Sequence, residues 1–162
     1  MVGKLLDSFL QPVSVLHPSY VKDTPHMLQI LQNSGSVRGQ ILFTSDVESL
    51  YTNIPHTLGS ERARQALSQH PQNLSSHAIN LLTRLLKLQL EHNNFSFEGR
   101  RFSQIHGVAM GKSWVPAYAN IYMAQWEKDL TQATSHLPQP NIWKRFIGDI
   151  FGTYPETDSQ PE

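Results

Sequence analysis

The sequence predicts an α+β fold in which a small antiparallel sheet packs on helices. Several segments repeat apolar residues with the 3.6-residue period of an amphipathic helix, most clearly at 75–92. Between them lie short apolar runs bounded by glycine, proline or asparagine, a pattern typical of strands joined by hairpins. Because helices are mixed with a few antiparallel strands, the α+β class is favoured.

The composition fits one domain of modest size and argues against several functional classes. The chain has 162 residues, with 13 basic and 13 acidic side chains and a formal net charge of zero, whereas an independent nucleic-acid-binding domain is usually basic. The eight histidines lack zinc-site spacing, and there are no cysteines to form disulfides or thiolate metal sites. No signal peptide and no apolar run of ~20 residues is visible. We expect a soluble, intracellular protein of the nucleus or cytoplasm that is not bound to a membrane.

Two helices are expected before the first strand. The first has one apolar face that ends at Pro12 and Pro18, and this face consists of Leu5, Leu6, Phe9 and Leu10. The second runs from Asp23, as its N-cap, to about Gln32. Residues 40–47 are mostly apolar and predict a centrally placed, buried strand that ends at a carboxylate, Asp46.

The remainder of the chain is expected to alternate helices with hairpins. The helices are predicted over 57–69, 75–92 and 116–131. One hairpin is predicted around Glu98-Gly99-Arg100 and another around Gly148-Asp149, because such pairs supply the positive φ that tight turns need. The tail from Pro155 is polar and is expected to fray.

Three features could carry chemistry. Asp46 ends a strand, Asp149 lies at a hairpin, and the glycine-containing loop 107–114 leads into a helix N-terminus, where free N–H groups favour a phosphate. Carboxylates on adjacent strands beside an anion site suit divalent metal ions and phosphoryl transfer. Ordinary alternatives stay open: a strand-end aspartate, a hairpin without function and a plain helix lead-in.

Three ordered segments resemble motifs of the reverse transcriptases of Penelope-like retroelements. They are motif A at 43–55, motif B at 107–111 with 116–123, and motif C at 145–151. Residues 6–12 and 18–24 also resemble the segment that precedes motif A in that family. Order and spacing agree across about residues 5–151, nearly the whole chain.

The resemblance implies a reverse-transcriptase palm with fingers and thumb largely missing. Residues 40–154 would be the palm, 1–39 a helical segment of partial fingers, and 155–162 a polar tail. The implied activity is RNA-directed DNA synthesis, in which two Mg²⁺ ions stabilise the attacking and leaving oxygens. The implied partners are an RNA template, a DNA primer and deoxynucleoside triphosphates.

The resemblance also implies roles for single residues. Asp46 and Asp149 would be the catalytic metal ligands, together with the backbone carbonyl of Val47. Tyr51 would be the steric gate whose ring blocks a ribose 2′-hydroxyl. The other residues implied to bind the nucleotide are Glu48, Ser49, Leu50, Gly107, Met110 and Gly111.

The chain departs from the family at residues on which the catalytic chemistry depends. Motif C has Gly148 where the family has the first of two aspartates, and glycine offers no side-chain oxygen to a metal ion. In motif B, Trp114 is expected to bring a large ring close to template or nucleotide, and Lys112 is expected either to favour a phosphate or to be an ordinary surface residue. We therefore expect an enzyme that is weak or inactive. The alternatives are a non-catalytic nucleic-acid- or protein-binding module derived from a palm, or a relic without function.

Overall fold

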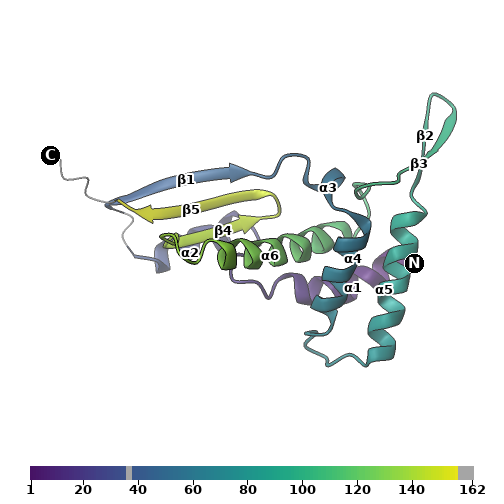
Figure 1. Cartoon of the computed structure of the whole chain (residues 1–162), viewed down its shortest axis with the longest axis horizontal. Coiled ribbons are helices and arrows are strands. Elements are labelled where there is room, and N and C mark those ends of the chain that lie inside the picture. Colours follow the sequence, from purple (N-terminus) through teal and green to yellow (C-terminus); the bar gives the residue numbers. More distant parts are fainter. Residues whose placement is uncertain (36–37, 157–162) are drawn as a thin grey trace. The chain divides into compact units, whose positions relative to one another are not determined.

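The structure, a computed structural model of the chain, describes residues 1–35 and 38–156, so residues 157–162 of the predicted tail lie outside the described part. The chain forms two compact units (Figure 1), each made of two segments. Unit 1 comprises Met1–His17 and Ser49–Glu127, and unit 2 comprises Pro18–Glu48 and Lys128–Glu162. Among the described residues, no helix has the length and apolar character to cross a membrane.

Unit 1 is built on three helices that contact one another pairwise. They are α1 (Val2–Ser14), α4 (His56–Leu67) and α5 (Ser76–Glu91). Their apolar stripes form the core of the unit, with Leu6, Leu10, Leu67, Leu82, Leu86 and Leu90 buried. The unit also holds the short helix α3 (Leu50–Asn53) and most of α6 (Val115–Ala133). The sequence left Ser75 and Ser76 as possible starts of α5, and the structure has Ser75 as the N-cap, because its hydroxyl accepts a hydrogen bond from the Ala78 N–H at 3.3 Å.

The first helix continues past the proline that was expected to end it. α1 includes Pro12 and runs to Ser14. A proline removes the N–H that would bond to the carbonyl one turn earlier. In the last turn this costs a single backbone bond, and burial of Leu10 and Val13 favours keeping the helical register.

A two-stranded hairpin completes unit 1. Its strands are β2 (Asn94–Phe97) and β3 (Arg100–Ser103), with Phe97 paired to Arg100. Both turn residues have positive φ, 49° at Glu98 and 74° at Gly99, which is the type I′ geometry that matches the twist of the strands. The predicted hairpin is confirmed.

Unit 2 consists of an antiparallel sheet, one complete helix and the C-terminal end of α6. The strands β1 (Gln40–Asp46), β4 (Ile142–Phe146) and β5 (Asp149–Pro155) lie in the order β1-β5-β4. The helix is α2 (Thr24–Asn33), and its predicted N-cap is confirmed, because the Asp23 carboxylate accepts a hydrogen bond from the His26 N–H at 2.9 Å. The segment from Ser19 to Val21 runs along the outer edge of β4, where both residues bond to the backbone of Arg145 at 2.7 and 2.9 Å.

The prediction that the first strand lies buried in the centre of the sheet is wrong. β1 is an edge strand, and Ile41 and Leu42 are 54% and 56% exposed. An apolar run predicts a strand but does not specify how many neighbours it has. The central strand is β5, which also includes Pro155, paired with Gln40, where the tail was expected to fray.

Candidate active site

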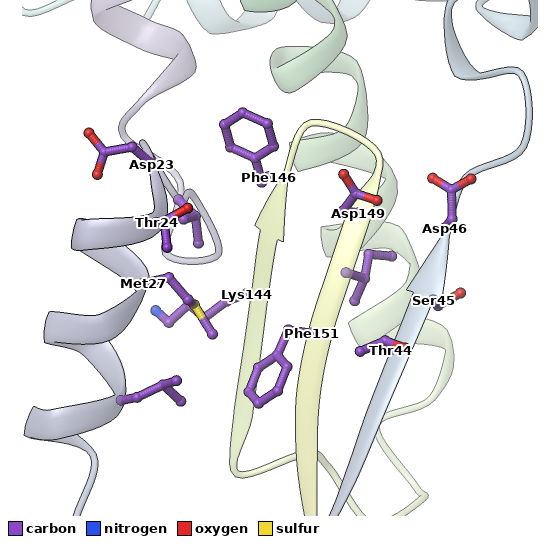
Figure 2. Close-up of a pocket in the computed structure, with 13 residues that line it drawn as sticks. Asp23, Thr24, Met27, Thr44, Ser45, Asp46, Lys144, Phe146, Asp149 and Phe151 are labelled. Carbon is purple, nitrogen blue, oxygen red and sulfur yellow. The ribbon is translucent and has the colours of Figure 1, made fainter.

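Two carboxylates meet at one end of the unit 2 sheet. Asp46 is the last residue of β1, Asp149 is the first residue of β5, and the two are direct partners in the antiparallel register. Direct partners point to the same face of a sheet, with Cβ atoms ~4.5–5.5 Å apart. Figure 2 shows both carboxylates at the ends of their strands. The structure thus brings together the two side chains that the sequence predicts as metal ligands.

Neither carboxylate is engaged with the protein. Both residues are exposed, and within the described part of the chain neither accepts a hydrogen bond or forms an ion pair. Like charges directly opposite each other on a sheet are destabilising. A cation between them would remove this repulsion, so the pair is suited to binding one.

The set of side-chain ligands is small. Among the described residues there is no cluster of three or more His, Cys, Asp or Glu side chains that could hold a metal ion. Mg²⁺ commonly takes one or two carboxylates and completes its shell with water and substrate phosphates. The pair Asp46 and Asp149 therefore fits this hard cation, but it offers no third carboxylate.

The turn that leads into Asp149 lies one residue earlier than predicted. Phe146 pairs with Asp149, so the turn residues are Ile147 and Gly148, and Asp149 already belongs to the strand. A positive φ of 56° falls on Ile147, which is uncommon for a β-branched residue. This register places the Asp149 side chain on the same face as Asp46.

Two hydrogen bonds fix this strained turn. The Arg145 guanidinium donates from Nη1 to the Ile147 carbonyl at 2.8 Å, and the Val47 N–H donates to the Gly148 carbonyl at 3.1 Å. The second bond ties the turn to the residue that follows Asp46. Arg145 is only 1% exposed, and sequence reasoning assigned it no role, although a charged residue inside an apolar strand run was a signal of a specific partner.

Replacing Arg145 by methionine should loosen the turn. Methionine keeps much of the buried volume but removes the charged donor to Ile147, a bond of a kind that contributes about 1.5–3 kcal/mol. We expect the free energy of unfolding to fall by about that amount in chemical denaturation. The control is Lys144→Met, because Lys144 donates to the Pro18 carbonyl in an exposed setting; an equal loss in both variants would contradict the role given to Arg145.

The carboxylate pair lies at the rim of a pocket in unit 2. Figure 2 shows the residues that line this pocket, beside α2. The pocket has a volume of about 710 Å³, within the range of small-molecule sites. Its apolar lining consists of Val21, Met27, Leu31, Phe146, Ile150 and Phe151, and its polar lining of Asp23, Thr24, Thr44, Ser45, Asp46, Lys144 and Asp149. Only the two aspartates were predicted, because the other lining residues are recognisable only once the register and the position of α2 are known.

The other predicted nucleotide-binding residues lie mainly in unit 1. The Val108 N–H donates to the Tyr51 carbonyl at 2.7 Å, and His56 Nε2 lies 2.7 Å from the Gly107 carbonyl oxygen. These bonds join the motif B loop to the motif A turn, which begins at Ser49 with a positive φ of 52°. Partial burial raises the pKa of Tyr51 above its usual value, because burial disfavours the charged phenolate.

Glycine is required at the point where the loop meets the turn. Gly107 has a φ of 71°, and a Cβ atom there would lie 2.5 Å from the Thr52 carbonyl oxygen. Gly111 has a φ of 95°, with no atom within 4 Å of the place that a Cβ would take. Of the other predicted residues, Leu50 is buried, whereas Glu48 and Met110 are exposed. The nucleotide-binding role of these residues stays a prediction.

The expectations for two drifted motif B residues need correction. Trp114 is fully buried, packs edge-on against Tyr118 at 5.5 Å and lies against Gly3, so its ring does not approach a template or nucleotide. Lys112 donates to the Gln89 carbonyl at 3.0 Å, in the last turn of α5, and burial lowers its pKa. A lysine at this place stabilises the end of the helix.

Comparison with solved structures shows a fold similar to part of telomerase. The chain aligns with telomerase from Candida albicans, in complex with the TWJ fragment of telomeric RNA, at a TM-score of 0.71 and 13% identity. It aligns with apo telomerase from Candida tropicalis, truncated from the C-terminal domain, at 0.67 and 14%. The alignments cover 95% and 97% of this chain but 30% and 34% of those chains, so it spans about a third of their length. No protein-family model matches the chain, and no curated protein matches it significantly.

At this identity the similarity shows the fold. Telomerase is a reverse-transcriptase relative, so the chain has a reverse-transcriptase-like α+β fold, and the predicted α+β class is confirmed. The roles of the individual site residues stay predictions.

Proposed function

We propose that the chain is a palm-centred part of a reverse transcriptase of the Penelope-like kind, weak or inactive in this copy. The observation that carries the proposal is the direct pairing of Asp46 with Asp149 at one end of the sheet. The reverse-transcriptase-like fold and the ordered resemblance to motifs A, B and C support it. Under this proposal residues 40–154 are the palm, and residues 1–39 precede it.

The proposed site assigns metal binding and nucleotide selection to different parts of the chain. Asp46, Asp149 and the Val47 carbonyl would hold Mg²⁺, which stabilises charge on the attacking and leaving oxygens during nucleotidyl transfer. The Tyr51 ring would select deoxynucleotides by excluding a ribose 2′-hydroxyl. Substrate partners would be an RNA template, a DNA primer and deoxynucleoside triphosphates.

The proposed weakness has its origin in the motif C turn. Gly148 occupies the position of a carboxylate that this chemistry needs, so only Asp46 and Asp149 would supply negative side-chain charge to two divalent cations, and their two charges fall short of the cations' four. Each 1.4 kcal/mol of lost transition-state stabilisation lowers the rate about tenfold. The same observation favours a second candidate, a palm-derived module that binds nucleic acid or protein without catalysis.

Binding of a divalent cation by the carboxylate pair gives the first test. Mg²⁺ should raise the melting temperature of the unmodified chain, because a ligand that binds only the folded state stabilises it. Asp46→Asn should abolish most of this shift. In EDTA the same variant should be more stable than the unmodified chain by about 0.2–1 kcal/mol, because the like-charge pair is gone.

The matched control for this thermal shift is Asp7→Asn in α1, which removes an acidic residue from unit 1. It should leave the Mg²⁺ shift unchanged. If Asp46→Asn and Asp149→Asn respond to Mg²⁺ like the unmodified chain, the pair is not a metal site and the proposed function fails.

A further inference from the structure

We propose that the β2–β3 hairpin of unit 1 binds single-stranded nucleic acid, with bases stacked on its phenylalanines and a phosphate held by Arg100. This site goes beyond the proposed function, because it needs neither a metal ion nor the aspartates of unit 2. Its ligand class follows from the chemistry of one hairpin face.

The pairing of the strands gathers the aromatic side chains on one face. Phe95 pairs with Phe102 and Phe97 pairs with Arg100, and alternate residues of a strand share a face. That face, named here the aromatic face, consists of Phe95, Phe97, Arg100 and Phe102. The opposite face consists of Asn94, Ser96, Arg101 and Ser103.

The aromatic face is exposed. Phe95, Phe97 and Phe102 are 52%, 62% and 43% exposed. Figure 1 shows the hairpin projecting beyond the end of α5, away from the other helices of unit 1. Clustered apolar side chains left in water mark binding surfaces in soluble proteins. Two of the rings contact each other, because Phe95 and Phe102 stack with centroids 5.5 Å apart and an interplanar angle of 22°.

The kinds of side chain fit single-stranded nucleic acid. Within residues 94–103 every large apolar side chain is phenylalanine and every basic one is arginine. Flat rings stack on any base, and the planar guanidinium both stacks and binds phosphate in a fork, which lysine does not do.

The spacing also fits a single strand. Phe95 and Phe97 are two residues apart on one strand, about 6.8 Å at ~3.4 Å per residue. Splayed bases of an extended strand can occupy such positions, while paired bases in a duplex cannot reach the rings. Arg100 stands directly across from Phe97, so a base stacked there places its phosphate near a cation. The acidic Glu98 is in the turn, off both strands.

Fluorescence anisotropy of the full chain with a labelled single-stranded RNA, in EDTA, tests the site. Phe97→Leu keeps an apolar side chain but removes the ring, and should weaken binding at least about fivefold. Arg100→Gln should lower the slope of log K against log salt by about 0.7, whereas Arg101→Gln, on the opposite face, should leave it nearly unchanged. Ser96→Ala, on the opposite face, is the matched control and should bind like the unmodified chain.

The retained ring gives a second readout. Phe97→Trp should keep the affinity, and its added fluorescence should be quenched by the oligonucleotide because the base stacks on the indole. Asp46→Asn should bind normally in EDTA, so failure of the metal site leaves this result unaffected. Circular dichroism of each variant confirms that the exposed substitution leaves the fold intact.

Two outcomes would overturn the proposal. One is equal RNA affinity for Phe97→Leu and the unmodified chain. The other is self-association in sedimentation velocity that Phe97→Leu abolishes while no oligonucleotide binds, which would assign the aromatic face to a second copy of the chain.

Discussion

Replacing Gly148 by aspartate is expected to tighten binding of Mn²⁺ or Mg²⁺ by about tenfold or more, which corresponds to about 1.4 kcal/mol or more. Gly148 lies in the turn directly before Asp149, and its carbonyl is held by the Val47 N–H at 3.1 Å. A carboxylate added there would join Asp46 and Asp149 on a backbone that is already fixed. Hard divalent cations gain affinity from each added carboxylate oxygen.

Titration of Mn²⁺ followed by electron paramagnetic resonance measures this gain directly. Gly148→Asn is the matched control, because it adds a side chain of the same shape without the charge and should bind Mn²⁺ like the unmodified chain. In a protein that joins this chain to fingers and thumb, primer extension on an RNA template should rise only in Gly148→Asp. Equal metal affinity in the aspartate and asparagine variants would show that the glycine is not the cause of the defect.

The same turn shows why the sequence located the carboxylates but not their geometry. The pattern of apolar run, Gly148-Asp149, apolar run correctly predicts a hairpin. It cannot show that positive φ falls on Ile147, because the choice between neighbouring two-residue turns depends on which side chains the register buries. Arg145 donates a hydrogen bond to the Ile147 carbonyl, and no local sequence pattern predicts this bond.

Burial was harder to predict than secondary structure. The helix α2 begins at the cap predicted at Asp23, and α5 begins at Ser75, one of the two neighbouring serines expected to start it, because capping depends on residues close in the sequence. The exposure of Ile41 depends on the order of the strands in the sheet. The complete burial of Trp114 depends on which helix packs against the loop 107–114. Those are contacts between distant segments, and periodicity within one segment carries no information about them.

Gly107→Ala is expected to lower the free energy of unfolding by about 2–5 kcal/mol. An alanine at a φ of 71° costs about 1–2 kcal/mol, because its Cβ crowds the carbonyl in the left-handed region. The same Cβ would lie 2.5 Å from the Thr52 carbonyl oxygen, and overpacking of this kind adds about 1–3 kcal/mol. The contacted atom belongs to the backbone, so it cannot rotate away.

Gly111→Ala separates these two causes. Gly111 has a φ of 95°, also in the left-handed region, but no atom lies within 4 Å of a Cβ placed there. It should lose about 1–2 kcal/mol, the conformational cost alone. Chemical denaturation of both variants measures the difference. Equal losses in the two variants would mean that the motif B loop can move away from Thr52. A larger loss at Gly107 would mean that the hydrogen bond from Val108 to Tyr51 holds the loop against the motif A turn, so that the loop cannot shift to make room for a Cβ atom.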